Sequence, residues 1–125
     1  MSAINTGTNA VTTITTGIGT NPTGVAVNPA GTRAYIANNS SAFVSVIDTA
    51  TNAVVATVAF LATMISITVN PAGTRAYVTG SNVLNKVGVI DTATNTVIAS
   101  ISISTSALWG IAVNPAGTRA YVTSL

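Results

Sequence analysis

The segment Asn-Pro-Ala-Gly-Thr-Arg-Ala-Tyr occurs three times in this chain, at residues 28–35, 70–77 and 114–121. The copies start 42 residues apart (28 to 70) and then 44 residues apart (70 to 114). A period of this length indicates one supersecondary unit copied in tandem. A chain built from copies is typical of a scaffold, so we expect specificity to lie where the copies differ.

A second shared element indicates where the strands lie. Val-Ile-Asp-Thr-Ala-Thr-Asn occupies 46–52 and 89–95, and the weaker copy Ala-Ile-Asn-Thr-Gly-Thr-Asn occupies 3–9. The two elements together predict four short strands per unit, at positions that we name A to D. These are Val25–Val27, Ile65–Val69 and Ile111–Val113 for A; Arg33–Ala37, Arg75–Thr79 and Arg119–Thr123 for B; Phe43–Ile47, Lys86–Ile90 and Met1–Ile4 for C; and Val54–Ala59, Val97–Ile103 and Val11–Thr16 for D.

The turns between these strands have a physical basis in the repeated residues. Pro29 presets φ at the first central position of an A–B turn, and Gly31 supplies the positive φ two residues later. In the C–D turn, Asp48 accepts bonds from backbone N–H groups ahead of it, and Asn52 tolerates a left-handed conformation. No segment shows a 3.6-residue apolar period with caps, so we expect no helix.

Several predicted strands are apolar on both faces, as in Val25-Ala26-Val27 and Val54-Val55-Ala56. A sheet with one solvated face would alternate instead. Four-stranded units of about 40–45 residues that are covered on both faces are typical of β-propeller blades. The predicted fold class is therefore all-β, with four-stranded antiparallel blades and three blade equivalents in the chain.

The amino-acid composition argues against several classes of chemistry and of binding partner. The chain is 48% hydrophobic but only 5% charged, which predicts that much of its surface is buried between units or chains. It has no cysteine and no histidine, which excludes thiol chemistry and removes the commonest general base and metal ligand. Its four cations form no nucleic-acid-binding stripe, and no apolar run reaches membrane-spanning length. We expect no cofactor, no nucleic-acid partner and no membrane insertion.

The residues resemble a known family at this point. An aromatic-led strand (Tyr35-Ile36-Ala37-Asn38 and its copies) is followed by Val-Ile-Asp-Thr-Ala-Thr-Asn and an outer strand, which is similar to the YVTN-repeat β-propellers. No copy carries the full Tyr-Val-Thr-Asn signature. The resemblance implies an extracellular or cell-surface protein, although the chain shows no signal peptide. The matching residues shape the fold, so no catalytic residue is carried over.

The alignment places both termini in the same B–C loop. Two blades are complete, at 17–60 and 61–103, and a third is split between strands C and D at 1–16 and strands A and B at 104–125. Propellers have about 4–8 blades, and raw strand edges invite association. We therefore expect a six-bladed homodimer closed by strand exchange, ahead of a nine-bladed trimer, another assembly or a fragment of a longer chain. The residues predicted to close the ring are Met1, Ala3 and Ile4 from one copy and Tyr121, Val122 and Thr123 from the other.

The copies differ most in the D–A and B–C loops, which share one face of a propeller. This face is the candidate binding face, with drift in unconstrained loops as the equal alternative. Trp109 is either a stacking platform for a sugar or other ring, or a residue that fills the central channel or packs on the next blade. The other candidate ligand-binding residues are Thr23, Met64, Ile65 and Leu108, for which packing is the competing interpretation.

Two charged positions recur, and we interpret both as structural. Arg33 and its copies are solvent-facing or backbone-bonding residues, with an anion site as the alternative, and Asp48 and Asp91 are turn formers that lack companion carboxylates for Ca²⁺. The favoured function is a non-enzymatic, self-assembling scaffold or binding module, natural or engineered. Lectin-like binding of a glycan or small ligand through the variable D–A/B–C loop face is the second hypothesis. A piece of a propeller enzyme such as a lactonase or lyase is the third.

Overall fold

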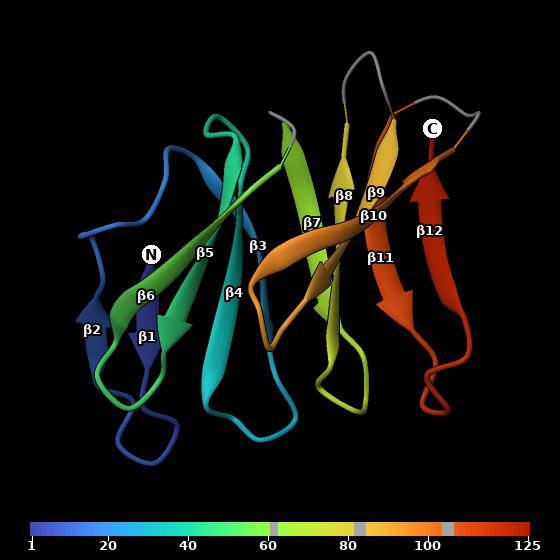
Figure 1. Ribbon diagram of the computed structural model, residues 1–125. Helices are drawn as coiled ribbons and strands as arrows, with labels where there is room; N and C mark the ends of the chain where they lie inside the picture. Colours follow the sequence, from blue (N-terminus) through green and yellow to red (C-terminus); the bar gives the residue numbers. More distant parts are fainter. Residues whose placement is uncertain (61–62, 82–84, 104–106) are drawn as a thin grey trace.

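The computed structural model describes residues 1–60, 63–81, 85–103 and 107–125, and in these residues all regular structure is β-strand (Figure 1). The candidate positions 62, 82–84 and 106 of the variable loops lie outside the described residues. The strands are β1 (Ser2–Ile4), β2 (Val11–Thr13), β3 (Pro22–Val27), β4 (Arg33–Asn38), β5 (Phe43–Asp48), β6 (Ala53–Ala59), β7 (Met64–Val69), β8 (Arg75–Gly80), β9 (Lys86–Asp91), β10 (Thr96–Ser102), β11 (Leu108–Val113) and β12 (Ala120–Ser124).

The strands form two complete antiparallel sheets and two hairpins. Blade 1 has the order β3-β4-β5-β6 and blade 2 the order β7-β8-β9-β10. The N-terminal hairpin is β1-β2 and the C-terminal hairpin is β11-β12. The predicted all-β class and the four-stranded antiparallel sheets are confirmed. The hairpins correspond to positions C–D and A–B of a blade.

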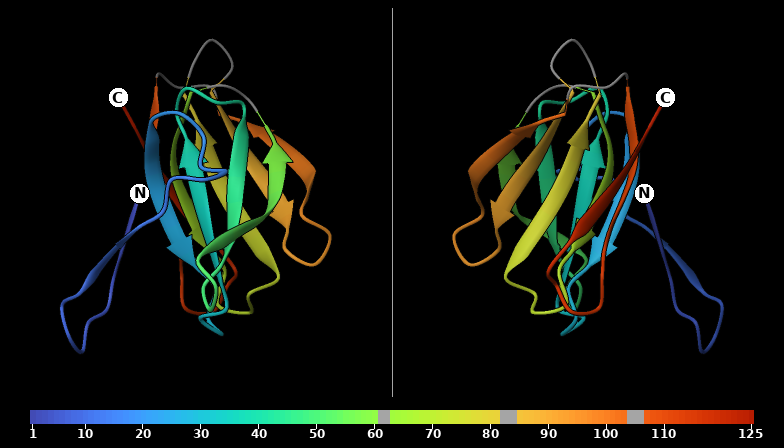
Figure 2. Two further views of the ribbon diagram at one scale, coloured as in Figure 1. Left: turned by 90° about the vertical axis from the view of Figure 1, so that its left-hand side faces the viewer. Right: turned by 90° about the vertical axis from the view of Figure 1, so that its right-hand side faces the viewer.

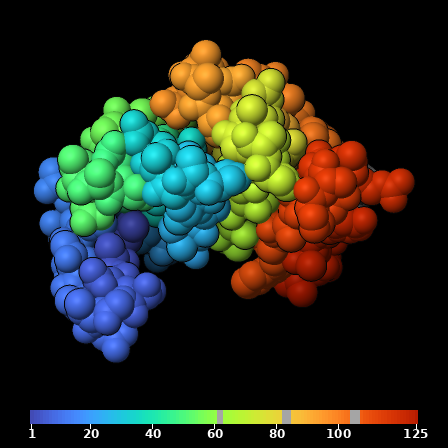
Figure 3. Space-filling view, turned by 90° about the horizontal axis from the view of Figure 1, so that it is seen from below, coloured from blue at the N-terminus to red at the C-terminus, as the bar shows by residue number. Residues whose placement is uncertain are grey.

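The four units follow one another along an arc. Viewed from below, the chain runs from the N-terminal hairpin through blades 1 and 2 to the C-terminal hairpin, and one side of the arc is open (Figure 3). The A–B and C–D turns lie together at the lower end of the strands in Figure 1. The N-terminal hairpin extends away from the two blades, as both side views show (Figure 2).

The turns are built as the sequence predicts. Gly31 has a φ of 71° and donates its N–H to the carbonyl of Asn28 at 2.8 Å. The Asn28 side chain secures the same turn, because its Oδ1 accepts from the N–H groups of Thr32 and Arg33 at 2.8 and 3.0 Å. Asn52 has a φ of 55°, in the left-handed region that asparagine tolerates.

The innermost strands start earlier than predicted. β3, β7 and β11 begin at Pro22, Met64 and Leu108, because these residues pair with position B after a bulge, as in the pair Pro22↔Asn38. The residues assigned to the D–A loops therefore lie partly within strands. The sequence does not reveal the early start of β3, because Pro22 and Gly24 are residues that usually indicate a loop.

The predicted strand Val11–Thr16 is also wrong in extent, since β2 ends at Thr13. In blade 1 the outer strand carries a bulge, with Val46 paired to Ala56 and Ile47 to Val54. The N-terminal hairpin has no such bulge and pairs Ala3 with Thr12. We attribute the short pairing to β1 having a hydrogen-bonded neighbour on one side only.

The main core lies between blades 1 and 2. Tyr35, Val44 and Val46 of blade 1 are buried together with Ile67 and Val78 of blade 2. A smaller cluster of Ala34, Ile36 and Ile47 lies on the opposite face of blade 1, where Met1 of the N-terminal hairpin packs against it. Blade 1 is thus buried on one face by blade 2 and covered in part on the other by the N-terminal hairpin, which explains strands that are apolar on both faces.

Gly24 allows the innermost strands β3 and β7 to approach closely. A Cβ atom built on Gly24 would lie 2.9 Å from the Ser66 Cα and 3.0 Å from the Ile65 carbonyl oxygen, and these backbone atoms cannot swing aside. We expect Gly24→Ala to lower the free energy of unfolding by about 1–3 kcal/mol, the usual cost of overpacking. Urea denaturation measures this. Gly7→Ala is the control, because its nearest neighbour would lie at 3.4 Å, and an equal loss in both variants would contradict the close approach.

Candidate functional site

In the described part of the chain, two strands lack a ladder partner that their equivalents in the complete blades have. β1 pairs only with β2, and β12 pairs only with β11. In blades 1 and 2 the equivalent strands at positions B and C pair with each other, as β4 does with β5 and β8 with β9. The chain therefore presents one free position-C edge and one free position-B edge, which are the two halves of a single ladder.

The face of the C-terminal hairpin is apolar and exposed. Tyr35, Tyr77 and Tyr121 occupy the same position of strand B in the three copies. Tyr35 is 1% exposed because blade 2 covers it, whereas Tyr121 is 60% exposed. Burial also raises the pKa of the Tyr35 hydroxyl above its ordinary value, although Arg33 acts in the opposite direction. The exposure of Tyr121 marks a blade face that has no neighbour.

The opposite end of the arc presents a second apolar face. Val25 in β3 is equivalent to Ile67 in β7, yet Val25 is 62% exposed and Ile67 only 5%. Two cavities lie beside Val25, of about 180 and 320 Å³. Residues of β1 and blade 1 line both cavities, including Met1, Ser2 and Ile36 in the smaller one. The space between the N-terminal hairpin and the inner part of blade 1 is thus an open apolar groove.

The six predicted closure residues are divided between these two ends. Met1, Ala3 and Ile4 belong to the N-terminal hairpin and its groove. Tyr121, Val122 and Thr123 lie in β12. The single chain does not bring the two groups together, since they lie on strands in separate sheets.

An ion pair joins positions B and C at the turn end of each complete blade. Arg33 Nη1 lies 2.5 Å from Asp48 Oδ2, and Arg75 Nη1 lies 2.7 Å from Asp91 Oδ2. The other carboxylate oxygen of Asp48 accepts from the N–H groups of Ala50 and Thr51 at 3.0 and 3.1 Å. The aspartates are turn formers, as predicted, but they also bind the arginines. Sequence reasoning missed this pairing, although both residue types recur at similar separations of 15 and 16 residues, which was the signal.

The carboxyl groups of Asp48 and Asp91 have pKa values below their ordinary value of 3.8. The largest cause is the bond from the backbone N–H three residues ahead (Thr51 or Thr94); burial opposes it, and the arginine supports it. Such a group stabilises the fold above its unfolded pKa, and this stabilisation is lost as the pH falls through the lower folded value.

We expect the free energy of unfolding to be level near neutrality and to fall once the pH drops below about 4, in the range of the ordinary carboxyl pKa. These two aspartates are the only acidic side chains in the chain. The double variant Asp48→Asn, Asp91→Asn should therefore flatten the profile. It should also keep its turns, because Asn5 accepts the equivalent bonds from Gly7 and Thr8 at 2.9 and 3.0 Å. Urea unfolding from pH 2 to 7 measures this, and an unchanged acid limb in the variant would refute the assignment.

The candidate ligand-binding residues lie at the start of the innermost strands. Trp109 in β11 is 51% exposed, and Thr23 in β3 is also exposed. The Thr23 hydroxyl donates to the Met64 carbonyl at 2.9 Å, so it bridges blades 1 and 2. Ile65 is half-buried, whereas Met64 and Leu108 are fully buried, and Met64 belongs to the main core between blades 1 and 2. Trp109 and Thr23 are thus the members of this set that solvent reaches most readily.

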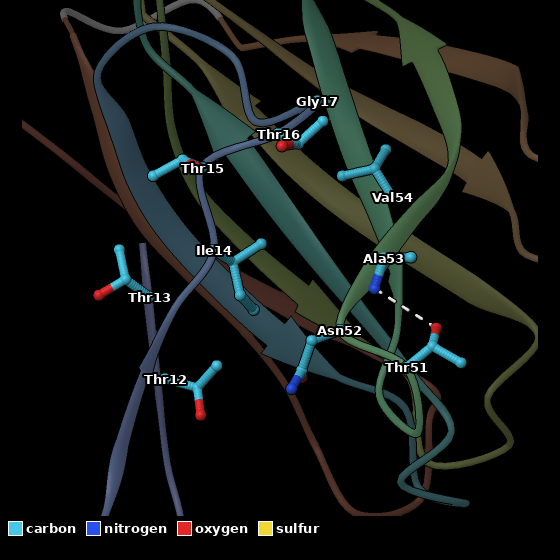
Figure 4. Close-up of a pocket in the computed structure, with 10 residues that line it drawn as sticks. All are labelled: Thr12, Thr13, Ile14, Thr15, Thr16, Gly17, Thr51, Asn52, Ala53 and Val54. Carbon is cyan, nitrogen blue, oxygen red and sulfur yellow. Dashed lines mark hydrogen bonds between the residues drawn. The ribbon is translucent and has the colours of Figure 1, made fainter.

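A cavity of about 570 Å³ lies at the outer rim, between the run from Thr12 to Gly17 and the β5–β6 turn (Figure 4). Its lining has no ionisable side chain. The turn side is braced by a bond from the Ala53 N–H to the Thr51 hydroxyl at 3.4 Å. The cavity lies where residues 14–16 were expected to continue strand D, and we interpret it as a consequence of the short β2.

The sequence matches no protein-family profile and no curated protein sequence. Among solved structures, hydrazine synthase from Kuenenia stuttgartiensis is similar, with a TM-score of 0.85 and 27% sequence identity over 93% of this chain. This chain covers 33% of the length of that chain. The similarity supports a β-propeller-like arrangement of repeated four-stranded sheets. Within the described residues, no helix is long and apolar enough to cross a membrane.

Proposed function

We propose that this chain is a non-enzymatic propeller scaffold whose ring is closed by strand pairing between two identical copies. The observation that carries the proposal is the match between its two exposed faces. The face that carries the exposed Tyr121 is equivalent to the face of blade 1 on which Tyr35 is buried. The face that carries the exposed Val25 is equivalent to the face of blade 2 on which Ile67 is buried. The interface between blades 1 and 2 is thus an internal template for the contact between copies.

In this arrangement the C-terminal hairpin of one copy occupies the apolar groove of the second. Tyr121 then covers Val25 and Ile36 of the second copy, as Tyr35 covers their equivalents in blade 2. β12 lies beside β1 of the second copy and completes a four-stranded blade. Twofold symmetry repeats the contact, so that two chains of three blade equivalents make six blades, within the usual range for propellers.

The absence of enzymatic activity is part of the proposal. The chain has no histidine or cysteine, and both aspartates are committed to turns and arginines. Hydrazine synthase is an enzyme by name, but the likeness extends over a third of its chain. We therefore transfer the arrangement of its sheets and not its activity.

A second candidate function is binding of a glycan or another ring-bearing ligand, and the half-exposed Trp109 favours it. An indole at the mouth of an innermost strand offers an apolar surface on which a sugar ring stacks. A glycan array reports this activity. Binding that Trp109→Ala abolishes would support it, whereas binding that persists in the variant would exclude this tryptophan as the platform.

Closure can be tested by blocking the free edge of β1 alone. The N–H groups of Met1 and Asn5 bond to Ile14 and Ala10 in the N-terminal hairpin, so the alternation of an antiparallel ladder turns the Ser2 N–H toward the empty side. We expect Ser2→Pro to prevent assembly, because proline removes that donor while the bonds to β2 remain. Ser2→Ala is the control.

Sedimentation velocity distinguishes the outcomes. Loss of the assembled species in Ser2→Pro but not in Ser2→Ala supports closure through β1. An assembled species that persists in Ser2→Pro would exclude it. A longer parent chain could supply the missing strands from its own blades, and a monomer in all three proteins would favour that alternative.

A further inference from the structure

We use the word seam for the proposed pairing of β12 of one copy with β1 of the other. We infer that residue 5 sets the strength of this seam, and that Asn5 makes it weaker than the equivalent β4–β5 and β8–β9 ladders of the complete blades. This inference rests on the proposed closure. It concerns the contact of Asn5 with Arg119 of the second copy, at the turn end of the composite blade.

The complete blades determine the register of the seam. β4 pairs with β5 through Arg33↔Asp48 and Tyr35↔Val46, and β8 pairs with β9 through Arg75↔Asp91 and Tyr77↔Val89. The repeat offsets carry this register to the composite blade, as Arg119↔Asn5, Ala120↔Ile4, Tyr121↔Ala3, Val122↔Ser2 and Thr123↔Met1.

The N-terminal hairpin already has the turn that this register requires. Asn5 Oδ1 accepts from the N–H groups of Gly7 and Thr8, as Asp48 Oδ1 accepts from Ala50 and Thr51. Asn9 has a φ of 57°, close to the 55° of its equivalent in blade 1. The backbone around Asn5 is therefore held as it is around the aspartates of the complete blades.

The next residue also fits this register. Thr49 bonds across blade 1, from its N–H to the Thr32 carbonyl at 3.2 Å and from its hydroxyl to the Gly31 carbonyl at 2.6 Å. Thr92 makes the same two bonds in blade 2. Thr6 is the equivalent residue, and in the described part of the chain it makes neither bond. In the seam its partners are Thr118 and Gly117 of the second copy.

The difference lies at the atom that faces the arginine. Asp48 uses Oδ1 for its turn and Oδ2 for Arg33. Asn5 likewise uses Oδ1 for its turn, which leaves Nδ2 to face Arg119 of the second copy. An amide nitrogen is a donor only, as is guanidinium, so the two groups cannot bond. The seam therefore keeps the threonine bonds but loses the ion pair.

The test is Asn5→Asp, a residue type that this turn already holds twice. A partly exposed ion pair contributes about 0.2–1 kcal/mol, so two symmetric seams should lower the dimer Kd by about two- to thirtyfold. The gain should shrink as salt is raised, because the pair is partly exposed. Sedimentation equilibrium measures the dissociation constant at each salt concentration.

Two comparisons isolate the pair from the change in net charge. Ser100→Asp adds the same charge on the exposed strand β10, away from the seam, and should give a smaller gain or none. Asn5→Asp combined with Arg119→Gln should lose the gain of Asn5→Asp. An unmodified chain that dimerises, with no tighter binding in Asn5→Asp than in Ser100→Asp, would overturn the inference and leave the proposed function standing. A chain that stays monomeric in every variant would overturn both.

Discussion

Tyr121→Ala is expected to convert the assembled ring into single chains with intact blades. In the proposed contact each Tyr121 is buried in the groove of the other copy, and a buried aromatic anchor of this kind contributes about 2 kcal/mol or more. Two anchors per dimer should therefore raise the Kd by about three orders of magnitude. Sedimentation equilibrium measures the loss, and far-UV circular dichroism reports whether the strands persist.

Val55→Ala is the matched control for this variant. Val55 is exposed to a similar extent, but it lies on the outer strand β6, away from both proposed contact faces. The control should retain the mass of the assembly. Equal effects of the two substitutions would refute the role of Tyr121, and so would a dimer that withstands its removal.

Tyr35→Ala is expected to damage the fold itself. Tyr35 occupies the position of Tyr121 one copy earlier, but its side chain is buried between blades 1 and 2. Truncating a buried aromatic residue costs about 3–5 kcal/mol, a large share of the 5–15 kcal/mol that stabilises a typical domain. Denaturant unfolding measures the loss.

Tyr77→Ala completes the series, because Tyr77 is only half-buried against the C-terminal hairpin. Its loss of stability should fall below that of Tyr35→Ala. A Tyr35 variant as stable as the unmodified chain would contradict the packing of blade 1 on blade 2. The three tyrosines thus separate the energetics of the fold from those of the assembly at one repeated position.

The sheets could be predicted from the sequence because the repeat carries local information. Pro29 and Gly31 determine the A–B turn through φ, and Asp48 and Asn52 determine the C–D turn through backbone bonds and a left-handed residue. These are short-range effects, and each recurs in the other copies. The order of strands within each blade followed from the same turns.

Other features depend on contacts that no local pattern reveals. β3 begins at Pro22 because this residue, which precedes Gly24, pairs with Asn38 of β4 across a bulge. β2 ends at Thr13, which we attribute to β1 having a neighbour on one side only. The ion pair of Arg33 and Asp48 joins two neighbouring strands. The sequence shows the spacing of these residues, but it does not show that their side chains meet. The sequence makes Met64 and Leu108 candidates for ligand binding, but both side chains are fully buried in the structure.

The most direct measurement of the central claim is the mass of the unmodified chain in solution, by sedimentation equilibrium over a range of concentrations. Closure by a second copy predicts a species of twice the 12.4 kDa chain mass that dissociates on dilution. A species of 12.4 kDa at every concentration would contradict closure between copies, and one of three times that mass would replace the six-bladed ring with a nine-bladed one.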